Sequence, residues 1–201
     1  MPTYSAVRDQ NHETLRRSVI AAAEGLLIGP GADAVTVRRV AQQLGCSTTV
    51  IYSLFGSKDG LANALYQDGC RLLQTALASV PHQGDPTRYM TDLGWAYWDF
   101  AQRHPQYYTF MFSGALPEFT PSSASLQDVA AAISLVSAVI EGYRSAGVLI
   151  TDDVHQTAKM IWAALHGVVQ LFFAGHLGDQ FAAQGIYERV LITIIGSLLV
   201  E

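Results

Sequence analysis

Residues 37–54 read Val-Arg-Arg-Val-Ala-Gln-Gln-Leu-Gly-Cys-Ser-Thr-Thr-Val-Ile-Tyr-Ser-Leu. The apolar or small residues of buried type in this stretch are Val40, Leu44, Cys46, Ile51 and Leu54. Ala41 stands where two crossing helices approach too closely for a larger side chain. Gly45 stands at the turn, where a positive φ favours glycine. A single amphipathic helix would explain the apolar period but not the alanine and glycine in register with it. The stretch therefore predicts a DNA-binding helix-turn-helix.

The composition indicates a folded, helix-rich protein. Half of the 201 residues are hydrophobic and 14% are charged, which is enough apolar chain for a sizeable core. The longest apolar run, residues 190–200, is too short to cross a bilayer, and the first ten residues lack the apolar segment of a signal peptide. Cys46 and Cys70 have no metal or redox spacing, and we expect Cys46 to be a small buried residue. These features favour a reduced, soluble, cytoplasmic protein.

The charge is unevenly distributed along the chain. Residues 1–60 hold six basic and five acidic residues, whereas residues 61–201 hold six basic and twelve acidic residues. The net charge of −5 therefore comes from the second part, and affinity for phosphate is expected in the first 60 residues.

The chain reads as a series of helices separated by glycine, proline and aspartate, without convincing strand alternation. Expected helices cover residues 11–28, 36–44, 47–54, 58–80, 85–103, 106–112, 125–147, 151–174 and 183–199. We expect Thr36, Ser47 and Ser57 to cap the second, third and fourth helices, and Asp85-Pro86 to open the fifth. Ser125 and Asp128 resemble a capping box.

These patterns predict an all-α protein with two domains. Residues 1–60 would form a three-helix DNA-binding domain of the helix-turn-helix type. Residues 61–201 would form a larger helical bundle for effector binding and dimerisation.

Several stretches resemble the TetR family of transcriptional regulators. Residues 47–61, Ser-Thr-Thr-Val-Ile-Tyr-Ser-Leu-Phe-Gly-Ser-Lys-Asp-Gly-Leu, resemble the family signature, in which a tyrosine closes the recognition helix and Phe-x-x-Lys leads into the fourth helix. Residues 36–41 resemble the family's second helix. Residues 162–167 resemble the Trp-x-x-x-His-Gly element of one C-terminal subgroup, and residues 104–112 resemble its sixth helix. Gly60 departs from the pattern, because the family commonly has an acidic residue there, so we expect a less rigid first turn.

The resemblance implies that the recognition helix, residues 47–54, lies in a major groove of DNA. The side chains expected at DNA are Thr36, Arg38, Arg39, Ser47, Thr48, Thr49, Val50, Tyr52, Ser53 and Lys58. Hydroxyl groups can reach base edges or phosphates, and methyl groups can contact thymine. Because the helix has no Arg, Asn or Gln for a bidentate base contact, we expect limited direct readout and a contribution from DNA shape. Capping, packing and solvated charge remain alternative roles for these residues.

A palindromic operator would require a homodimer. The last helix is apolar over more than one face, so we expect dimerisation through the last two helices. The resemblance also implies a cavity for a small apolar or aromatic effector, whose occupancy moves the fourth helix. Its expected lining residues are Trp95, Trp98, Tyr108, Met111, Phe112, Trp162, His166 and Phe173. A plain aromatic core is the alternative. We expect a repressor that the effector releases from DNA, with corepression left open.

Two other classes of function have less support in the sequence. Residues 142–147, Gly-Tyr-Arg-Ser-Ala-Gly, have one residue too many for a nucleophile elbow and fall in a helix, and His155, His166 and His176 lack metal spacing. We therefore expect neither an enzyme nor a metal or cofactor site. The second class is a helical interaction protein that kept the fold without binding DNA. The weak positive charge of residues 1–60 is its support.

Overall fold

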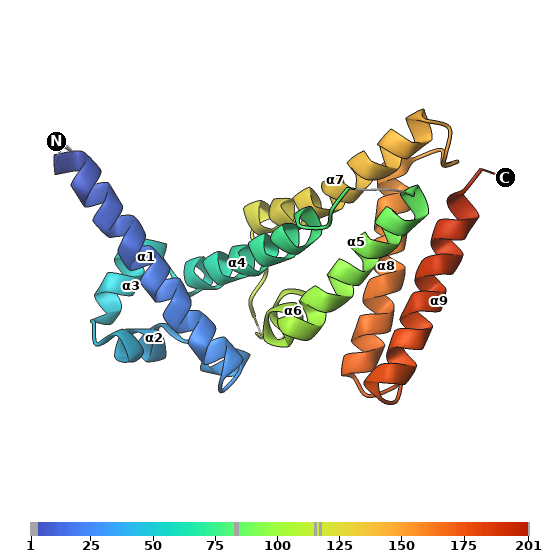
Figure 1. Ribbon diagram of the computed structural model, residues 1–201. Coiled ribbons are helices and arrows are strands. Elements are labelled where there is room, and N and C mark those ends of the chain that lie inside the picture. The colour runs from blue at the N-terminus through green and yellow to red at the C-terminus, as the bar shows by residue number, and fades with distance from the viewer. Residues whose placement is uncertain (1–3, 83–84, 115, 117, 201) are drawn as a thin grey trace. The chain divides into compact units, whose positions relative to one another are not determined.

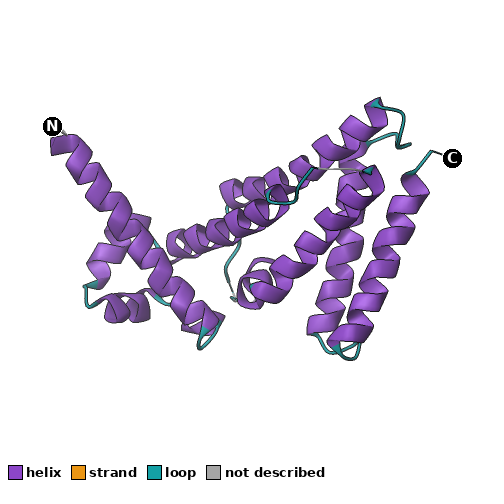
Figure 2. Cartoon of the chain, viewed as in Figure 1, coloured by secondary structure: helices purple, strands orange, loops and turns teal. Residues whose placement is uncertain are grey.

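A computed structural model describes residues 4–82, 85–114, 116 and 118–200. Helices joined by loops make up almost all of this part of the chain (Figures 1 and 2). They are α1 (Tyr4–Ile28), a 3-10 turn η1 (Ala32–Ala34), α2 (Val37–Leu44), α3 (Thr48–Phe55), α4 (Lys58–Ala78), α5 (Pro86–Arg103), α6 (Pro105–Phe112), α7 (Ser123–Ser145), α8 (Val154–Phe173) and α9 (Gln180–Leu198). Within the described ranges, β-structure is limited to an isolated bridge between Leu149 and Leu199. The predicted all-α class is confirmed.

The chain forms two compact units. The first contains residues 1–69 and 104–126, and the second contains residues 70–103 and 127–201. Both α4 and α7 belong in part to each unit, so the chain enters the second unit twice within a helix and leaves it between α5 and α6. The functional boundary expected near residue 60 stays a prediction.

Local capping explains where several helices begin. The Thr36 hydroxyl accepts a hydrogen bond from the Arg39 backbone N–H (3.3 Å), and the Ser57 hydroxyl accepts one from the Gly60 N–H (2.9 Å). At α5, the Asp85 carboxylate accepts from the Arg88 N–H (3.2 Å). These bonds satisfy N–H groups that lack a partner within the first helical turn. The capping roles predicted for Thr36, Ser57 and Asp85 are confirmed.

Other helix starts differ from the sequence-based expectation. Helix α1 begins before Asn11, and α9 begins after the Asp179 cap rather than at Ala183. At α7 the predicted capping box is wrong, because the Ser122 hydroxyl accepts from the Ser125 N–H (3.2 Å). The buried Ser125 hydroxyl instead donates to Asn63 Oδ1 (2.7 Å), so this serine ties α7 to α4.

Helix α7 is long and apolar enough to cross a membrane by length and composition, with an 18-residue window of mean hydropathy 1.6. The sequence-based search for spanning segments missed it, because serine and alanine interrupt its larger apolar residues. Five of its apolar residues line the cavity of the second unit described below. The apolar composition of α7 therefore has a role within the bundle.

Aromatic side chains form the core of the second unit where α5, α8 and α9 meet. Trp98 is 1% exposed, and its ring lies 4.9 Å from that of Tyr187 and 5.5 Å from that of Phe172, measured between centroids. The Tyr187 hydroxyl donates to the backbone oxygen of Gly94 (2.6 Å). A Cβ at Gly94 would lie 2.6 Å from a methyl carbon of Leu191, so glycine permits the close approach of α5 and α9.

The two cysteines should differ in reactivity. Burial raises the pKa of the Cys70 thiol from 9.0 to about 12, and the charge of Asp128 adds to this effect. Because the thiolate is the reactive form, we expect iodoacetamide at pH 8 to label the half-buried Cys46 and to spare Cys70 in the folded protein. The contribution of the Cys70 thiol to stability is present below about pH 9 and is lost as the pH rises toward 12. Mass spectrometry should show one label per chain, and two labels on a folded chain would contradict this expectation.

Candidate nucleic-acid interface and ligand cavity

Helices α2 and α3 form the predicted helix-turn-helix in the first unit (Figure 1). Gly45 ends α2 with φ 64° and ψ 29°, the left-handed conformation that the turn requires. Val40, Ala41 and Ile51 are buried between the helices, as expected. Leu44, Cys46 and Leu54 are only half-buried, so the prediction that Cys46 is buried is wrong. The central contact between the two helices is therefore buried, whereas the residues at the turn and at the end of α3 stay partly exposed to solvent.

The recognition helix presents short polar side chains to solvent. Ser47, Thr48, Thr49, Tyr52 and Ser53 are exposed, and Val50 is half-buried. Tyr52 is 48% exposed, which is a large exposed area for an aromatic side chain. Ser47 occupies the cap position of α3, but its side chain makes no capping hydrogen bond. Its hydroxyl therefore does not have the capping role that the sequence suggested.

Three exposed cations lie in the first turns of the helices before and after α3. Arg38 and Arg39 in the first turn of α2 are exposed, as is Lys58 at the start of α4. Thr36 is half-buried, and its hydroxyl already accepts the Arg39 N–H. The N-termini of α2 and α4 add the positive end of a helix dipole near these side chains. Cations and helix N-termini together favour binding of phosphate groups.

Arg16 of α1 anchors the end of α3, a contact that sequence reasoning missed. Its guanidinium carbon lies 4.5 Å from the centroid of the Phe55 ring, and its Nη1 donates to the backbone oxygen of Leu54 (3.3 Å). Because 38 residues separate Arg16 from Leu54 in the chain, no local pattern indicates the contact. The arginine fixes the C-terminal end of the recognition helix against α1.

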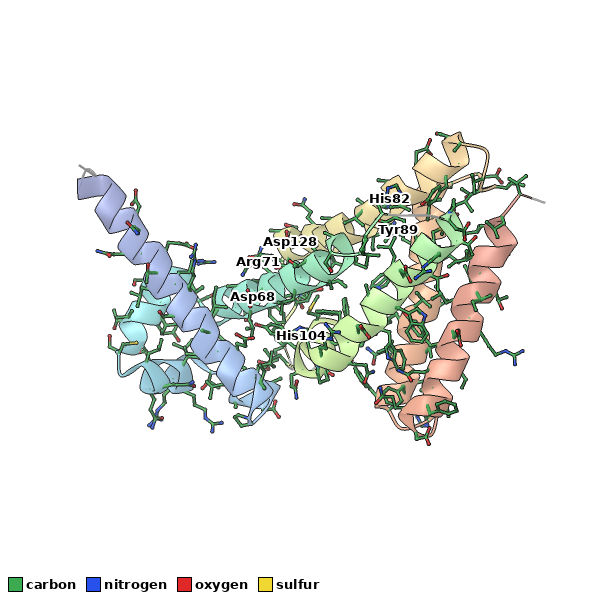
Figure 3. The ribbon with its side chains drawn as sticks, viewed as in Figure 1. Asp68, Arg71, His82, Tyr89, His104 and Asp128 are labelled. Carbon is green, nitrogen blue, oxygen red and sulfur yellow. The ribbon has the colours of Figure 1, made fainter. Side chains whose placement is uncertain are left out.

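A polar cluster joins α1, α4 and α6 within the first unit. The Tyr107 hydroxyl donates to Asp68 Oδ2 (2.6 Å). Burial raises the pKa of Glu24, the charge of Asp68 raises it further, and the charge of His104 opposes the shift. Figure 3 labels Asp68 on α4 and His104 at the start of α6. These charges lie close enough to interact, so α1, α4 and α6 are electrostatically coupled.

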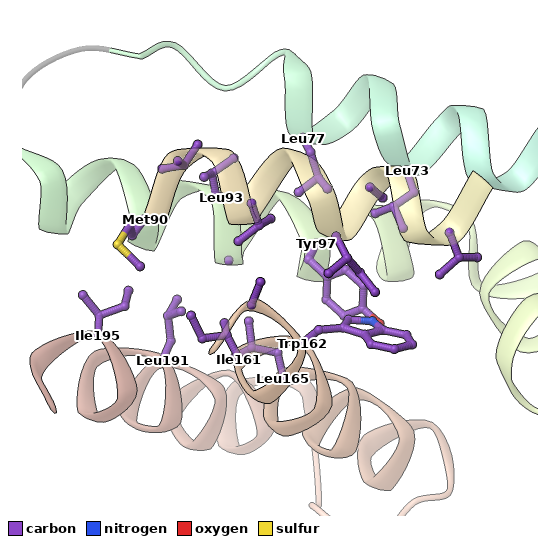
Figure 4. Close-up of a pocket in the computed structure, with 17 residues that line it drawn as sticks. Leu73, Leu77, Met90, Leu93, Tyr97, Ile161, Trp162, Leu165, Leu191 and Ile195 are labelled. Carbon is purple, nitrogen blue, oxygen red and sulfur yellow. The ribbon is translucent and has the colours of Figure 1, made fainter. Parts of the chain in front are cut away.

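The second unit contains an apolar cavity of about 70 Å³ (Figure 4). Its lining comes from the second half of α4 and from α5, α7, α8 and α9. Aliphatic residues such as Leu77, Leu93, Ile161 and Leu191 make up most of the wall. An apolar cavity of this kind can accept an apolar ligand.

One end of the cavity carries a hydrogen-bonded group of three side chains. The Trp162 indole N–H donates to the Tyr97 hydroxyl oxygen (3.2 Å), and the Tyr97 hydroxyl lies 3.1 Å from His166 Nδ1. Tyr97 and Trp162 line the cavity, whereas His166 is not among its lining residues. Burial lowers the pKa of His166, which favours the neutral imidazole. Trp162 and His166 of the Trp-x-x-x-His-Gly element thus act together through Tyr97.

The cavity and the predicted ligand residues overlap only in part. Of the eight predicted side chains, Trp162 lines the cavity and His166 reaches it through Tyr97. Three others, Tyr108, Met111 and Phe112, belong to the first unit. Trp95, Trp98 and Phe173 lie outside the lining, and Trp98 is part of the aromatic core. The aliphatic wall was missed because its residues are scattered over five helices and resemble any buried residues.

Helices α8 and α9 pack against each other, and both also carry apolar residues that the rest of the chain does not cover. We call these residues the α8/α9 face, which comprises Met160, Ala163, Gly167, Leu171, Ile186 and Ile192. All of these residues except the half-buried Gly167 are exposed. A Cβ at Gly167 would meet nothing within 4 Å, so packing within the chain does not require glycine there. Exposed apolar residues on two neighbouring helices make this pair a candidate interaction site.

Features of an enzyme site do not assemble around the nucleophile-like stretch. The Ser145 hydroxyl donates to Glu141 Oε1 (2.9 Å) at the exposed end of α7. Among the residues that the structure describes, no group of three or more His, Cys, Asp or Glu side chains could hold a metal ion.

Solved structures share this fold. A protein of unknown function from Rhodococcus sp. RHA1 is 24% identical, with 92% of this chain and 96% of that chain covered and a TM-score of 0.79. The TetR family transcriptional regulator PfmR from Thermus thermophilus is 18% identical, with 89% and 97% covered and a TM-score of 0.66. A bacterial regulatory protein in the tetR family from Rhodococcus RHA1 is 17% identical, with 92% and 98% covered and a TM-score of 0.68. At these identities the likeness shows the fold alone.

Family comparisons add sequence-level evidence. Residues 19–65 match the family described as bacterial regulatory proteins, tetR family. Residues 90–194, more than half of the chain, match the tetracyclin repressor-like C-terminal domain. None of the curated proteins matches the sequence. With both parts of the chain matched, and with the helix-turn-helix in place, the chain belongs to the TetR family of DNA-binding transcriptional regulators, which are not enzymes.

Proposed function

We propose that this regulator is a cytoplasmic homodimeric repressor that binds a palindromic operator and is released by a small apolar effector. The observation that carries the proposal is the combination of an exposed recognition helix in one unit and an apolar cavity in the other. The DNA-binding part would be residues 1–60, and residues 61–201 would bind the effector and a second copy of the chain.

The exposed face of α3 suits contacts to DNA in a major groove. Serine and threonine hydroxyls would reach base edges or phosphates, and Val50 would meet thymine methyl groups. Arg38, Arg39 and Lys58 would bind phosphates on either side. Since the exposed side chains of α3 are short, DNA shape would supply part of the specificity.

Dimerisation would occur through the α8/α9 face. One recognition helix supplies little affinity, whereas two in a two-fold dimer read both halves of a palindrome. Ala163 and Gly167 would let a partner helix approach closely, and the larger apolar residues around them would be buried. A four-helix contact between subunits follows from this arrangement.

Helix α4 would carry the response to the effector. Leu73 and Leu77 in its second half line the cavity, whereas Lys58 in its first turn follows the recognition helix after two residues. An effector that binds one position of α4 better than the other would shift the population of DNA-binding dimers. We propose that the filled cavity favours the form that releases DNA. Tighter DNA binding with the effector would instead indicate a corepressor.

We expect selection from a random duplex pool at low salt to recover a palindrome. Tyr52→Ala and Lys58→Ala should each weaken binding to it by about 10-fold or more, because each removes a hydrogen bond to a charged phosphate from both subunits. Lys58→Ala should also reduce the slope of log affinity against log salt. Fluorescence anisotropy of a labelled duplex measures both quantities.

The control for this experiment is Arg144→Ala, which also removes one exposed cation but lies at the end of α7 beside Glu141. It should leave operator affinity within about twofold, because exposed ion pairs contribute little. A folded dimer that enriches no duplex, with or without candidate effectors, would instead support a helical interaction protein.

A further inference from the structure

The residues that line the cavity define the chemistry of its ligand more narrowly than "a small apolar effector". We infer that it takes an uncharged, elongated apolar molecule whose single hydrogen-bonding group contacts the Tyr97 hydroxyl at one end. This inference rests on the proposed function, because it assumes that the cavity is the effector site. It adds the charge, the shape and the polar anchor of the effector.

The wall offers almost nothing but hydrocarbon. Of the seventeen described residues that line the cavity, fifteen have no side-chain oxygen or nitrogen atom, and the other two are Tyr97 and Trp162. The Trp162 N–H already donates to the Tyr97 hydroxyl, so groups that form hydrogen bonds would lose their water without compensation anywhere except beside that hydroxyl. The ligand must match a wall that is apolar along its length.

A net charge on the ligand would be strongly disfavoured. The seventeen lining residues include no Asp, Glu, Lys, Arg or His. Arg71 and Asp128 are on helices that contribute to the lining, but neither side chain is part of it. Behind Tyr97, His166 has a lowered pKa because of burial, which opposes a positive charge there. A carboxylate or an ammonium group would thus be buried without an ionic partner.

The cavity is elongated along α5. Figure 4 shows Met90 and Ile195 at one end and Tyr97 and Trp162 at the other. Met90 and Tyr97 are separated by about two helical turns, or about 10 Å along the helix axis. An extended chain of about eight carbon atoms has this length, and its terminal polar group would then reach Tyr97. Because such a chain occupies more than the about 70 Å³ of the empty cavity, the lining helices must move apart to admit it.

His166 acts here as a positioning residue. Its Nδ1 lies 3.1 Å from the Tyr97 hydroxyl, while the Trp162 N–H donates to the same hydroxyl oxygen. These two contacts fix where the tyrosine oxygen lies at the cavity wall. Trp162 and His166 therefore set the position of the Tyr97 hydroxyl, and this hydroxyl orients a ligand that has one polar end.

The inference can be tested with the DNA-free protein and three molecules of matched length: octanol, octanoate and octylammonium. Isothermal titration calorimetry should show octanol binding about 10-fold or more tightly than either ion. Tyr97→Phe should weaken octanol binding by roughly 2- to 10-fold, because one hydrogen bond is lost. Tyr143→Phe is the matched control, since the Tyr143 hydroxyl lies 3.3 Å from His82 Nε2 in another tyrosine–histidine pair. It should leave octanol affinity unchanged.

Thermal melting of both variants checks that they fold, so that a loss of octanol binding can be assigned to the hydroxyl. Equal or tighter binding of octanoate or octylammonium would overturn the inference, as would a lack of binding by octanol. A separate anisotropy assay with operator DNA tests the proposed function. If octanol binds selectively but does not change DNA affinity, the effector role fails while the assignment of ligand chemistry stands. If octanoate binds best and releases DNA, the effector role stands and this inference fails.

Discussion

Replacing Gly60 by alanine is expected to lower the free energy of unfolding by about 1–3 kcal/mol, although alanine normally favours a helix. A Cβ at residue 60 would overlap the backbone oxygen of Phe55 and lie 2.9 Å from its carbonyl carbon. Because these are backbone atoms, the end of α3 or the start of α4 must shift. We expect operator affinity to fall as well, since Lys58 and the recognition helix flank this contact.

Thermal and urea unfolding measure the first effect, and anisotropy with the selected operator measures the second. Gly142→Ala is the matched control, because Gly142 is also helical but a Cβ there would meet nothing within 4 Å. It should raise stability slightly, by about 0.5–1 kcal/mol. Unchanged stability and DNA binding in Gly60→Ala would show that the first turn of α4 adjusts without cost.

Placing a charge on the α8/α9 face should separate the subunits. Ile192→Asp would bury a carboxylate in the proposed dimer interface without a partner, so we expect a folded monomer. The monomer should bind the palindrome roughly 10²–10⁴-fold more weakly, because the second half-site no longer benefits from a linked recognition helix. Analytical ultracentrifugation gives the oligomeric state and anisotropy gives the affinity.

Leu126→Asp is the control for this substitution. Leu126 and Ile192 are equally exposed in the single chain, at 54%, but Leu126 lies in the first turn of α7. An aspartate is tolerated there, because negative charge near a helix N-terminus is favourable. We expect this variant to remain a dimer. Dimers of normal DNA affinity in Ile192→Asp would place the subunit contact elsewhere.

The sequence predicted helix boundaries best where capping residues and prolines mark them. Helix α5 begins at Pro86 and ends at Arg103 as expected, because an aspartate cap and a proline mark its start and a second proline follows it. Helix α1 extends further toward the N-terminus than expected, because the polar residues before Asn11 show no apolar period. Ser125 was misassigned because its bond to Asn63 joins residues 62 positions apart.

The two candidate sites were predictable to different degrees. The DNA-facing residues lie in one continuous motif, so the sequence places Tyr52 and Lys58 on the surface of consecutive helices. The cavity depends on how five helices pack, and aromatic residues were a misleading guide to it. Trp98 fills space against Tyr187, whereas Tyr97, its neighbour in the chain, faces the cavity. A change of one position along a helix turns a side chain by about 100°, which composition cannot resolve.

The cavity also has a volumetric consequence. Empty space that unfolding removes lowers the volume of the system, so the cavity of about 70 Å³ adds to the volume decrease on unfolding. Hydrostatic pressure favours the state of smaller volume, so the empty regulator is intrinsically sensitive to compression. A ligand that fills the space removes this volume term, and the filled protein resists pressure even where its contacts with the ligand are weak.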